Sequence, residues 1–166
     1  MNLHQRILIA FVLLFLLNVK ILTAQGYTNA IGLRGGVFSG ITGKHLMTPD
    51  KAIEGIFSTR WRGFNLCGLY ELYKPTSFLE NLYWYYGAGA HIGSYRRYSY
   101  YDEADSARAY PGNLTTLGLD GILGLEYKLH EIPFVVSVDF KPTLDFISGG
   151  GFFFDAALSA RYYFSR

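Results

Sequence analysis

The residues of this chain whose types could do chemistry together lie around His91. His91 and Ser94 are three positions apart, and carboxylates follow at Asp102, Glu103 and Asp105. A histidine, a serine and a carboxylate can form a hydrolase or acyltransferase site if the base lies within about 3 Å of the nucleophile. On a strand, residues three apart point to opposite faces and are separated by about 10 Å. The spacing therefore argues against a dyad, and we expect His91 to bond a neighbouring charge or tyrosine.

Two further candidate sites have simpler structural explanations. The stretch 87–93 (GAGAHIG) superficially resembles a phosphate-binding loop, but such a loop must join a strand to a helix. Here it continues a strand, so we expect Gly87, Gly89 and Gly93 to make room for neighbouring tyrosine rings. Cys67 is the only cysteine, which excludes an internal disulfide, and the four histidines lack metal-ligand spacing. We expect no cofactor and no metal, with Cys67 as a small interior filler.

These residues must be positioned by strands, and the strand pattern is clearest in residues 152–164 (FFFDAALSARYYF). Successive side chains of a strand point to opposite faces. Here one parity is wholly apolar, and the other carries Asp155 and Arg161. The apolar parity has aromatic residues at both ends, which is typical of the closing strand of a transmembrane barrel.

The same alternation predicts eight strands. Bacterial single-chain barrels have an even number of strands, with the longer loops outside. With eight strands, the long polar segment 96–113 becomes an outer loop. The weakest divisions are Ser39-Gly40 and Arg62-Gly63, each of which is a tight turn or a bulge in a longer strand. The predicted strands cover residues 30–38, 41–47, 52–60, 64–73, 82–95, 115–128, 132–141 and 152–164.

One parity of nearly every predicted strand is apolar, and the other carries charges of both signs. An exposed charge at the bilayer midplane costs roughly 2–4 kcal/mol, so in a membrane barrel the charged parity must face the lumen. Balanced signs allow these charges to pair, as buried charges require. The predicted lumen charge network consists of Arg34, Glu54, Arg60, Glu71, Asp120, Glu126, Asp139, Lys141, Asp155 and Arg161, and Lys44, Lys128 and His91 share its parity.

Residues 1–24 have the features of a secretory signal peptide. Arg6 precedes an apolar run at 7–17, and Ala24 offers a small residue before a cut. Eleven apolar residues are too few for a membrane-spanning helix, which needs roughly 20. Cleavage would leave one domain, residues 25–166. Because the leader holds two of the 15 basic residues, Arg6 and Lys20, that domain has 13 basic and 13 acidic residues. This balance argues against nucleic-acid binding.

The pattern resembles the small eight-stranded outer-membrane barrels of the OmpA/OmpX class over residues 28–164. The resemblance implies an all-β, eight-stranded antiparallel up-and-down transmembrane barrel in a Gram-negative outer membrane. It also implies that the barrel-assembly machinery reads Tyr162 and Phe164, although the tail Ser165-Arg166 departs from the usual terminal aromatic residue. The stretches that carry the resemblance are AIGLRGG, AIEGIF, FNLCGLYELY, LYWYYGAGAHIG and GLDGILGLEY.

We therefore predict an outer-membrane barrel with a structural or surface-interaction role. An interior of eight strands is only wide enough for side chains, so no wide pore is expected. The expected partners are outer-membrane lipid, lipopolysaccharide, the assembly machinery and an unidentified extracellular ligand. Cations and aromatic residues of the outer loop could contact such a ligand: Arg96, Arg97, Tyr100, Tyr101 and Arg108.

Two alternatives belong to other functional classes. Some small outer-membrane barrels modify lipid A, using a histidine with a serine near the outer leaflet. A soluble periplasmic barrel could instead use its apolar parity to line a ligand cavity, as lipocalins do. Alternation alone does not say which parity points inward, so the second alternative depends on the direction of the two faces.

Overall fold

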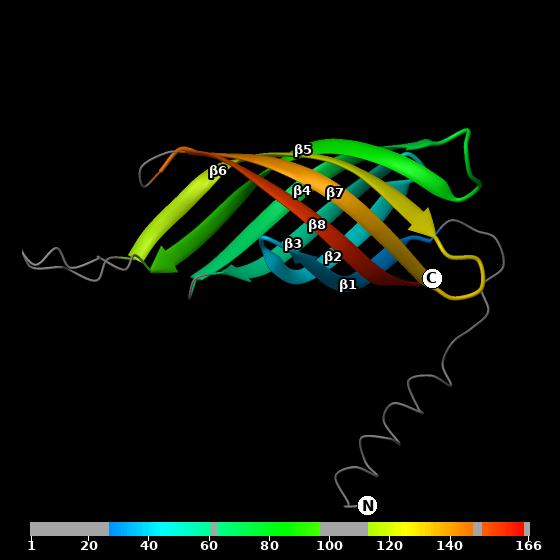
Figure 1. Ribbon diagram of the computed structural model, residues 1–166, viewed down its shortest axis with the longest axis horizontal. Helices are drawn as coiled ribbons and strands as arrows, with labels where there is room; N and C mark the ends of the chain where they lie inside the picture. The colour runs from blue at the N-terminus through cyan, green and yellow to red at the C-terminus, as the bar shows by residue number, and fades with distance from the viewer. Residues whose placement is uncertain (1–26, 61–62, 97–112, 148–150, 165–166) are drawn as a thin grey trace, which may run out of the picture.

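The computed structural model describes residues 27–60, 63–96, 113–147 and 151–164. In these ranges the chain forms a closed barrel of eight strands, each antiparallel to its neighbours, with the last strand paired to the first (Figure 1). The predicted all-β, eight-stranded barrel is thus confirmed. The strands are β1 (Asn29–Gly36), β2 (Ser39–Thr48), β3 (Lys51–Arg60), β4 (Gly63–Pro75), β5 (Leu82–Arg96), β6 (Asn113–Lys128), β7 (Phe134–Asp145) and β8 (Gly151–Phe164).

The two uncertain divisions of the sequence lie between separate strands. β1 and β2 are distinct and pair with each other, as do β3 and β4. The first turn is displaced from its predicted place, because Ser39 and Gly40 belong to β2 and the bend falls at Val37 and Phe38. The second turn lies outside the described residues, as does the predicted signal peptide. No helix in the described part of the chain is long and apolar enough to cross a membrane.

The largest boundary error concerns β7, which was predicted to end at residue 141. The strand runs through Pro142 to Asp145. Proline lacks a backbone N–H, so it weakens the ladder without preventing an extended backbone. Accordingly, the pairing of β6 with β7 skips two positions, between Asp120↔Thr143 and Leu123↔Phe140.

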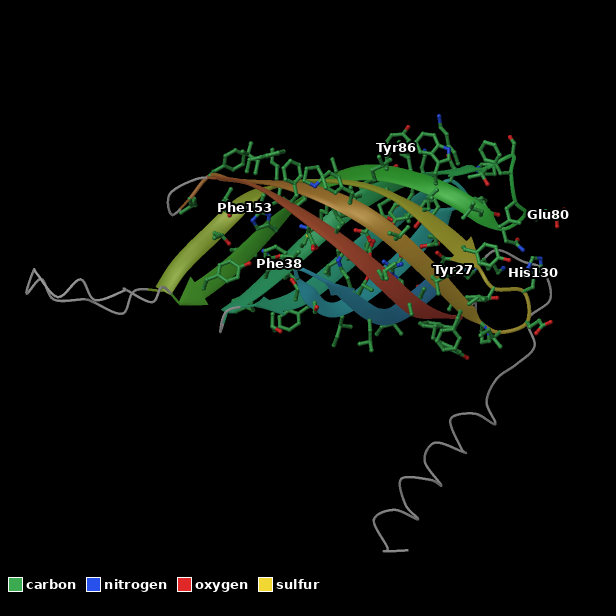
Figure 2. The ribbon with its side chains drawn as sticks, viewed as in Figure 1. Tyr27, Phe38, Glu80, Tyr86, His130 and Phe153 are labelled. Carbon is green, nitrogen blue, oxygen red and sulfur yellow. The ribbon has the colours of Figure 1, made fainter. Side chains whose placement is uncertain are left out.

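Burial alternates along every strand. In β7, Val135, Ser137, Asp139 and Lys141 are buried, whereas the residues between them are partly or largely exposed. Figure 2 shows outward side chains projecting from the barrel surface, with Tyr86 on the outside of β5. The buried parity is the charged one, so the polar side chains fill the interior and the apolar side chains cover the outside.

The two ends of the barrel differ. β1 begins and β8 ends at the same end, which we call the terminal end (Figure 1). Two turns are tied together there: the backbone N–H of Lys128 donates to the carbonyl of Asn81 at 3.0 Å, and the Asn81 amide lies 2.7 Å from Nε2 of His130. Asn81 has a φ of 62°, a left-handed conformation that asparagine tolerates.

Three glycines of β5, Gly87, Gly89 and Gly93, lie close to the backbone of β4. A Cβ on Gly87 or Gly89 would lie 2.2 Å or 1.9 Å from a carbonyl oxygen of β4, and one on Gly93 would lie 2.8 Å from another. They permit close approach of the neighbouring strand, so the expectation that they make room for tyrosine rings was wrong. The glycine that does so is Gly124 of β6, whose Cβ would lie 2.5 Å from Cζ of Tyr85.

We expect Gly124→Ala to lower the free energy of unfolding by about 1–3 kcal/mol, because the added methyl overlaps the buried Tyr85 ring. Gly43→Ala is the matched control, since a Cβ there has no atom within 4 Å. The control should be neutral or slightly stabilising. Urea unfolding in detergent micelles measures both. Equal losses in the two variants would contradict the assigned packing.

Candidate functional site: the charged lumen

The lumen holds many charged side chains, each almost completely shielded from solvent. Nine of the ten residues singled out from the sequence point inward and are at most 5% exposed; the side chain of the tenth, Arg60, lies outside the described residues. A buried charge is tolerated only when it is paired and hydrogen-bonded. The nine are Arg34, Glu54, Glu71, Asp120, Glu126, Asp139, Lys141, Asp155 and Arg161.

Lys44 lies at the centre of the largest group. Its ammonium is 2.8 Å from a carboxylate oxygen of Glu71 and 3.3 Å from one of each of Glu54 and Glu126. Arg161 reaches two of these carboxylates, Glu54 and Glu126, from β8. We call these five residues, Lys44, Glu54, Glu71, Glu126 and Arg161, the central cluster. It joins five strands through the middle of the barrel.

All three guanidinium nitrogens of Arg161 have partners in the lumen. Nη2 pairs with Glu54, Nη1 donates to Oγ of Ser137 at 2.8 Å and lies 3.5 Å from Glu126, and Nε donates to Oγ1 of Thr42 at 3.2 Å. The planar fork of arginine can serve several acceptors in fixed directions, which lysine cannot do. The side chain therefore fixes strands on several sides of the lumen relative to β8.

Three tyrosines complete the central cluster. Tyr27 donates its hydroxyl to Glu126, and Lys44 donates to the hydroxyl of Tyr73. The ring of Tyr73 stacks on that of Tyr85, with centroids 5.2 Å apart, and the Lys44 ammonium lies 4.3 Å from the Tyr85 centroid. Sequence reasoning missed Tyr27 because it precedes the first predicted strand.

A second group surrounds Arg34 of β1. Its guanidinium forms a two-pronged pair with Asp139, with both N–O distances 2.6 Å, and a third contact with Asp155 at 3.1 Å. Asp155 also accepts from the backbone N–H of Val37 at 3.0 Å. Paired N–H groups in this geometry form some of the strongest hydrogen bonds in proteins. The group ties β1 to β7 and β8.

A third group is centred on His91. Its Nδ1 lies 2.8 Å from Asp120 and its Nε2 lies 2.6 Å from Asp145. Carboxylates only accept, so this arrangement favours the imidazolium, in which both nitrogens donate. Asp120 also accepts from Lys141 at 2.6 Å and from Sγ of Cys67 at 3.5 Å. Asp145 was missed because the predicted strand ended before Pro142.

The described geometry does not form a catalytic dyad. His91 is buried, whereas Ser94 lies on the outward parity of β5 and is partly exposed. Both ring nitrogens of His91 face carboxylates, so neither is directed at the serine. Asp102, Glu103 and Asp105 lie outside the described residues. Within the described ranges, no group of three or more histidine, cysteine or acidic side chains is arranged to hold a metal ion.

The outside of the barrel is apolar all the way round. Leu33, Leu158 and Leu119, in the strands β1, β8 and β6, are 70%, 68% and 55% exposed. Aromatic residues lie near both ends: Trp84 stacks on Tyr86 at 5.2 Å near the terminal end. Further aromatic contacts join Phe134 to Tyr162 at the terminal end, and Phe140 and Phe152 to Phe154 towards the opposite end.

The remaining residues singled out from the sequence lie near the two ends. Phe164 is the last residue of β8, is 43% exposed and pairs with Asn29, and Tyr162 lies two positions before it on the same face. Arg96 ends β5, but its side chain lies outside the described residues. The proposed contact residues Arg97, Tyr100, Tyr101 and Arg108 lie wholly outside them.

We expect Arg34→Met to lower the free energy of unfolding by about 3–5 kcal/mol, because it leaves Asp139 and Asp155 buried without a cation. Arg34→Lys is the control: it keeps the charge and loses the two-pronged geometry, so its loss should be smaller. Urea unfolding in detergent micelles ranks the two variants. Wild-type stability in Arg34→Met would show that the pair does not hold the strands together.

No protein-family model matches the chain, and no curated protein matches it in sequence. In structure it is similar to the N-terminal β-barrel domain of OprF from Pseudomonas aeruginosa, at 16% sequence identity and a TM-score of 0.66, over 84% of this chain and 100% of that one. It is also similar to neisserial surface protein A (NspA), at 11% identity and a TM-score of 0.49, over 84% of this chain and 100% of that one. At such low identity, the likeness to the OprF domain shows the fold. The chain therefore has the fold of the small eight-stranded outer-membrane β-barrels, the class that its strand pattern resembles.

Proposed function

We propose that the protein is an integral outer-membrane barrel with a structural or surface-interaction role. The observation that carries this proposal is the distribution of polarity: large apolar side chains are exposed all round, and charged side chains are buried. Water would disfavour such an exterior, whereas lipid requires it. A soluble lipocalin-like barrel would need the reverse, an apolar cavity under a polar surface. The inward charges argue against that alternative.

The barrel has a natural orientation in such a membrane. Outer-membrane barrels place both termini and their short turns in the periplasm. The terminal end of this barrel, with the turns that follow β2, β4 and β6, would then face the periplasm. The longest connection between described strands, 97–112, would face the cell exterior. In this scheme residues 1–24 are a signal peptide, and the assembly machinery reads Tyr162 and Phe164.

The filled lumen argues against a wide pore. Buried side chains from every strand fill it, and ion pairs cross it at several levels. Eight-stranded barrels have room for little more than their own side chains. Function would then depend on the exterior and on the outer loop, where Arg96, Arg97, Tyr100, Tyr101 and Arg108 could contact lipopolysaccharide or an extracellular ligand. Lipid and the assembly machinery are the other partners.

We expect the expressed protein to remain with the outer-membrane fraction and to be extracted only by detergent. On a gel it should migrate faster before boiling than after, because a closed barrel stays compact until it is heated. Cell fractionation with heated and unheated samples checks both expectations. Recovery in the osmotic-shock fraction, which holds soluble periplasmic proteins, would overturn the proposal.

A charge on the outward face should be tolerated near the membrane surface and costly near the middle. Leu123 is 53% exposed on the outward parity of β6, and Leu123→Arg should cost roughly 2–4 kcal/mol in folding free energy in lipid vesicles. Tyr127→Arg is the control, on the same strand and parity at the terminal end, and should cost at most about 1 kcal/mol. Equal losses would contradict the proposed position of the membrane.

A further inference from the structure

The charges of the central cluster do not balance if every group is ionised. Three carboxylates, Glu54, Glu71 and Glu126, surround two cations, Lys44 and Arg161, and each of the five side chains is at most 3% exposed. An excess buried charge is costly in a medium of low polarity, and a carboxylate in that position takes up a proton instead.

The other described cations of the lumen parity, Arg34, Lys141 and Lys128, have partners of their own, and the Lys128 ammonium lies 5.1 Å from the centroid of the Tyr163 ring at the terminal end. Arg34, the next guanidinium, already faces two aspartates of its own, Asp139 and Asp155. Lys141 is bound to Asp120 in the group around His91. Neither group has a positive charge to spare for the central cluster.

Two carboxylate oxygens mark where the proton belongs. Oε1 of Glu71 is buried and has no described donor, and Oε2 of Glu54 is buried and contacts only the Lys44 ammonium, at 3.3 Å and without a hydrogen bond. Glu54 pairs with Leu69 and Ala52 with Glu71 in the β3–β4 ladder, so the two glutamates are diagonal neighbours on the inward face. Both carboxylates lie against the same Lys44 ammonium, at 3.3 Å for Glu54 and 2.8 Å for Glu71. Two ionised carboxylates in this arrangement can only repel.

Glu126 differs from these two glutamates. Its Oε1 accepts from the Tyr27 hydroxyl, and its Oε2 lies 3.3 Å from Lys44 and 3.5 Å from Arg161. Both oxygens of Glu126 therefore already have described donors, which distinguishes it from the other two glutamates.

We propose that Glu54 and Glu71 form a proton-binding site, in which one proton is shared between the two carboxyl groups. The proton gives the pair a donor, gives Oε1 of Glu71 a partner and makes the central cluster neutral. Like-charged carboxyls in close contact commonly hold a proton in this way, and the proton belongs to the pair as a whole. This inference concerns the lumen and goes beyond the proposed role in the membrane.

The proton is enclosed by groups from nearly every side of the lumen. Besides the two glutamates, the titratable and charged side chains that face the site are Tyr27 before β1, Arg34 of β1, Lys44 of β2, Cys67 and Tyr73 of β4, Tyr85 of β5, Glu126 of β6 and Arg161 of β8. The two cations of the central cluster are already held by the carboxylates, so loss of the proton would leave one negative charge uncompensated. The barrel should become less stable as the pH is raised through the deprotonation of the pair.

The test compares wild type, Glu71→Gln and Glu126→Gln, each refolded in lipid vesicles, by infrared spectroscopy and urea unfolding. Wild type at neutral pH should show the carbonyl stretch of a protonated carboxyl, and this band should disappear at alkaline pH together with part of the stability. Glu71→Gln should lose the pH-dependent band and keep a wild-type unfolding midpoint at neutral pH, because an amide N–H replaces the shared proton. Glu126→Gln removes the excess negative charge and leaves the pair in place, so its band should disappear at a lower pH than that of wild type.

Two results would overturn the proposal. The first is the absence of a protonated-carboxyl band in wild type at neutral pH, which decides the question even if a variant fails to fold. The second is a band that persists unchanged in Glu71→Gln. Both readouts are independent of where the protein resides in the cell, so failure here is distinguishable from failure of the proposed function.

Discussion

The whole structure depends on one requirement, that charges enclosed by an apolar exterior must be neutralised inside the barrel. Because the outward parity is apolar all round, the inward side chains must find partners in the lumen. Long side chains meet this requirement by reaching past their immediate neighbours: Arg34 extends from β1 to β7, and Arg161 from β8 to β3. Loss of one partner from such a pair is far more costly than the pair is stabilising, because the other charge stays buried.

Much of the fold was predictable because it depends on a pattern of period two. Alternation identified the strands and their two faces, since a strand assigns every side chain to one side or the other. The errors occurred where backbone chemistry interrupts the pattern. The predicted strand stopped at residue 141, yet β7 continues through Pro142 to Asp145 and only the ladder is interrupted. The sequence also failed to reveal that Gly124, rather than the glycines of β5, accommodates Tyr85.

Partners across the lumen could not be predicted from the same pattern. Parity shows that Glu54 and Arg161 point inward. Whether their side chains come into contact depends on strand tilt and on how the barrel closes, and alternation carries no information about either. Tyr27 and Asp145 are the clearest examples. Both lie outside the predicted strands, and each provides a bond to a group that the sequence had placed in the lumen, Glu126 and His91 respectively.

The closure of β1 on β8 has a consequence for folding. The two strands come from opposite ends of the described chain, and their pairing is the most non-local contact in the ladder. Non-local contacts form slowly, because the entropy of loop closure opposes them. Arg34 finds Asp139 and Asp155, and Arg161 finds Glu54 and Thr42, only across this junction. A barrel open at the junction would leave these buried charges unpaired, so the charged interior favours the fully closed barrel over a partly open sheet.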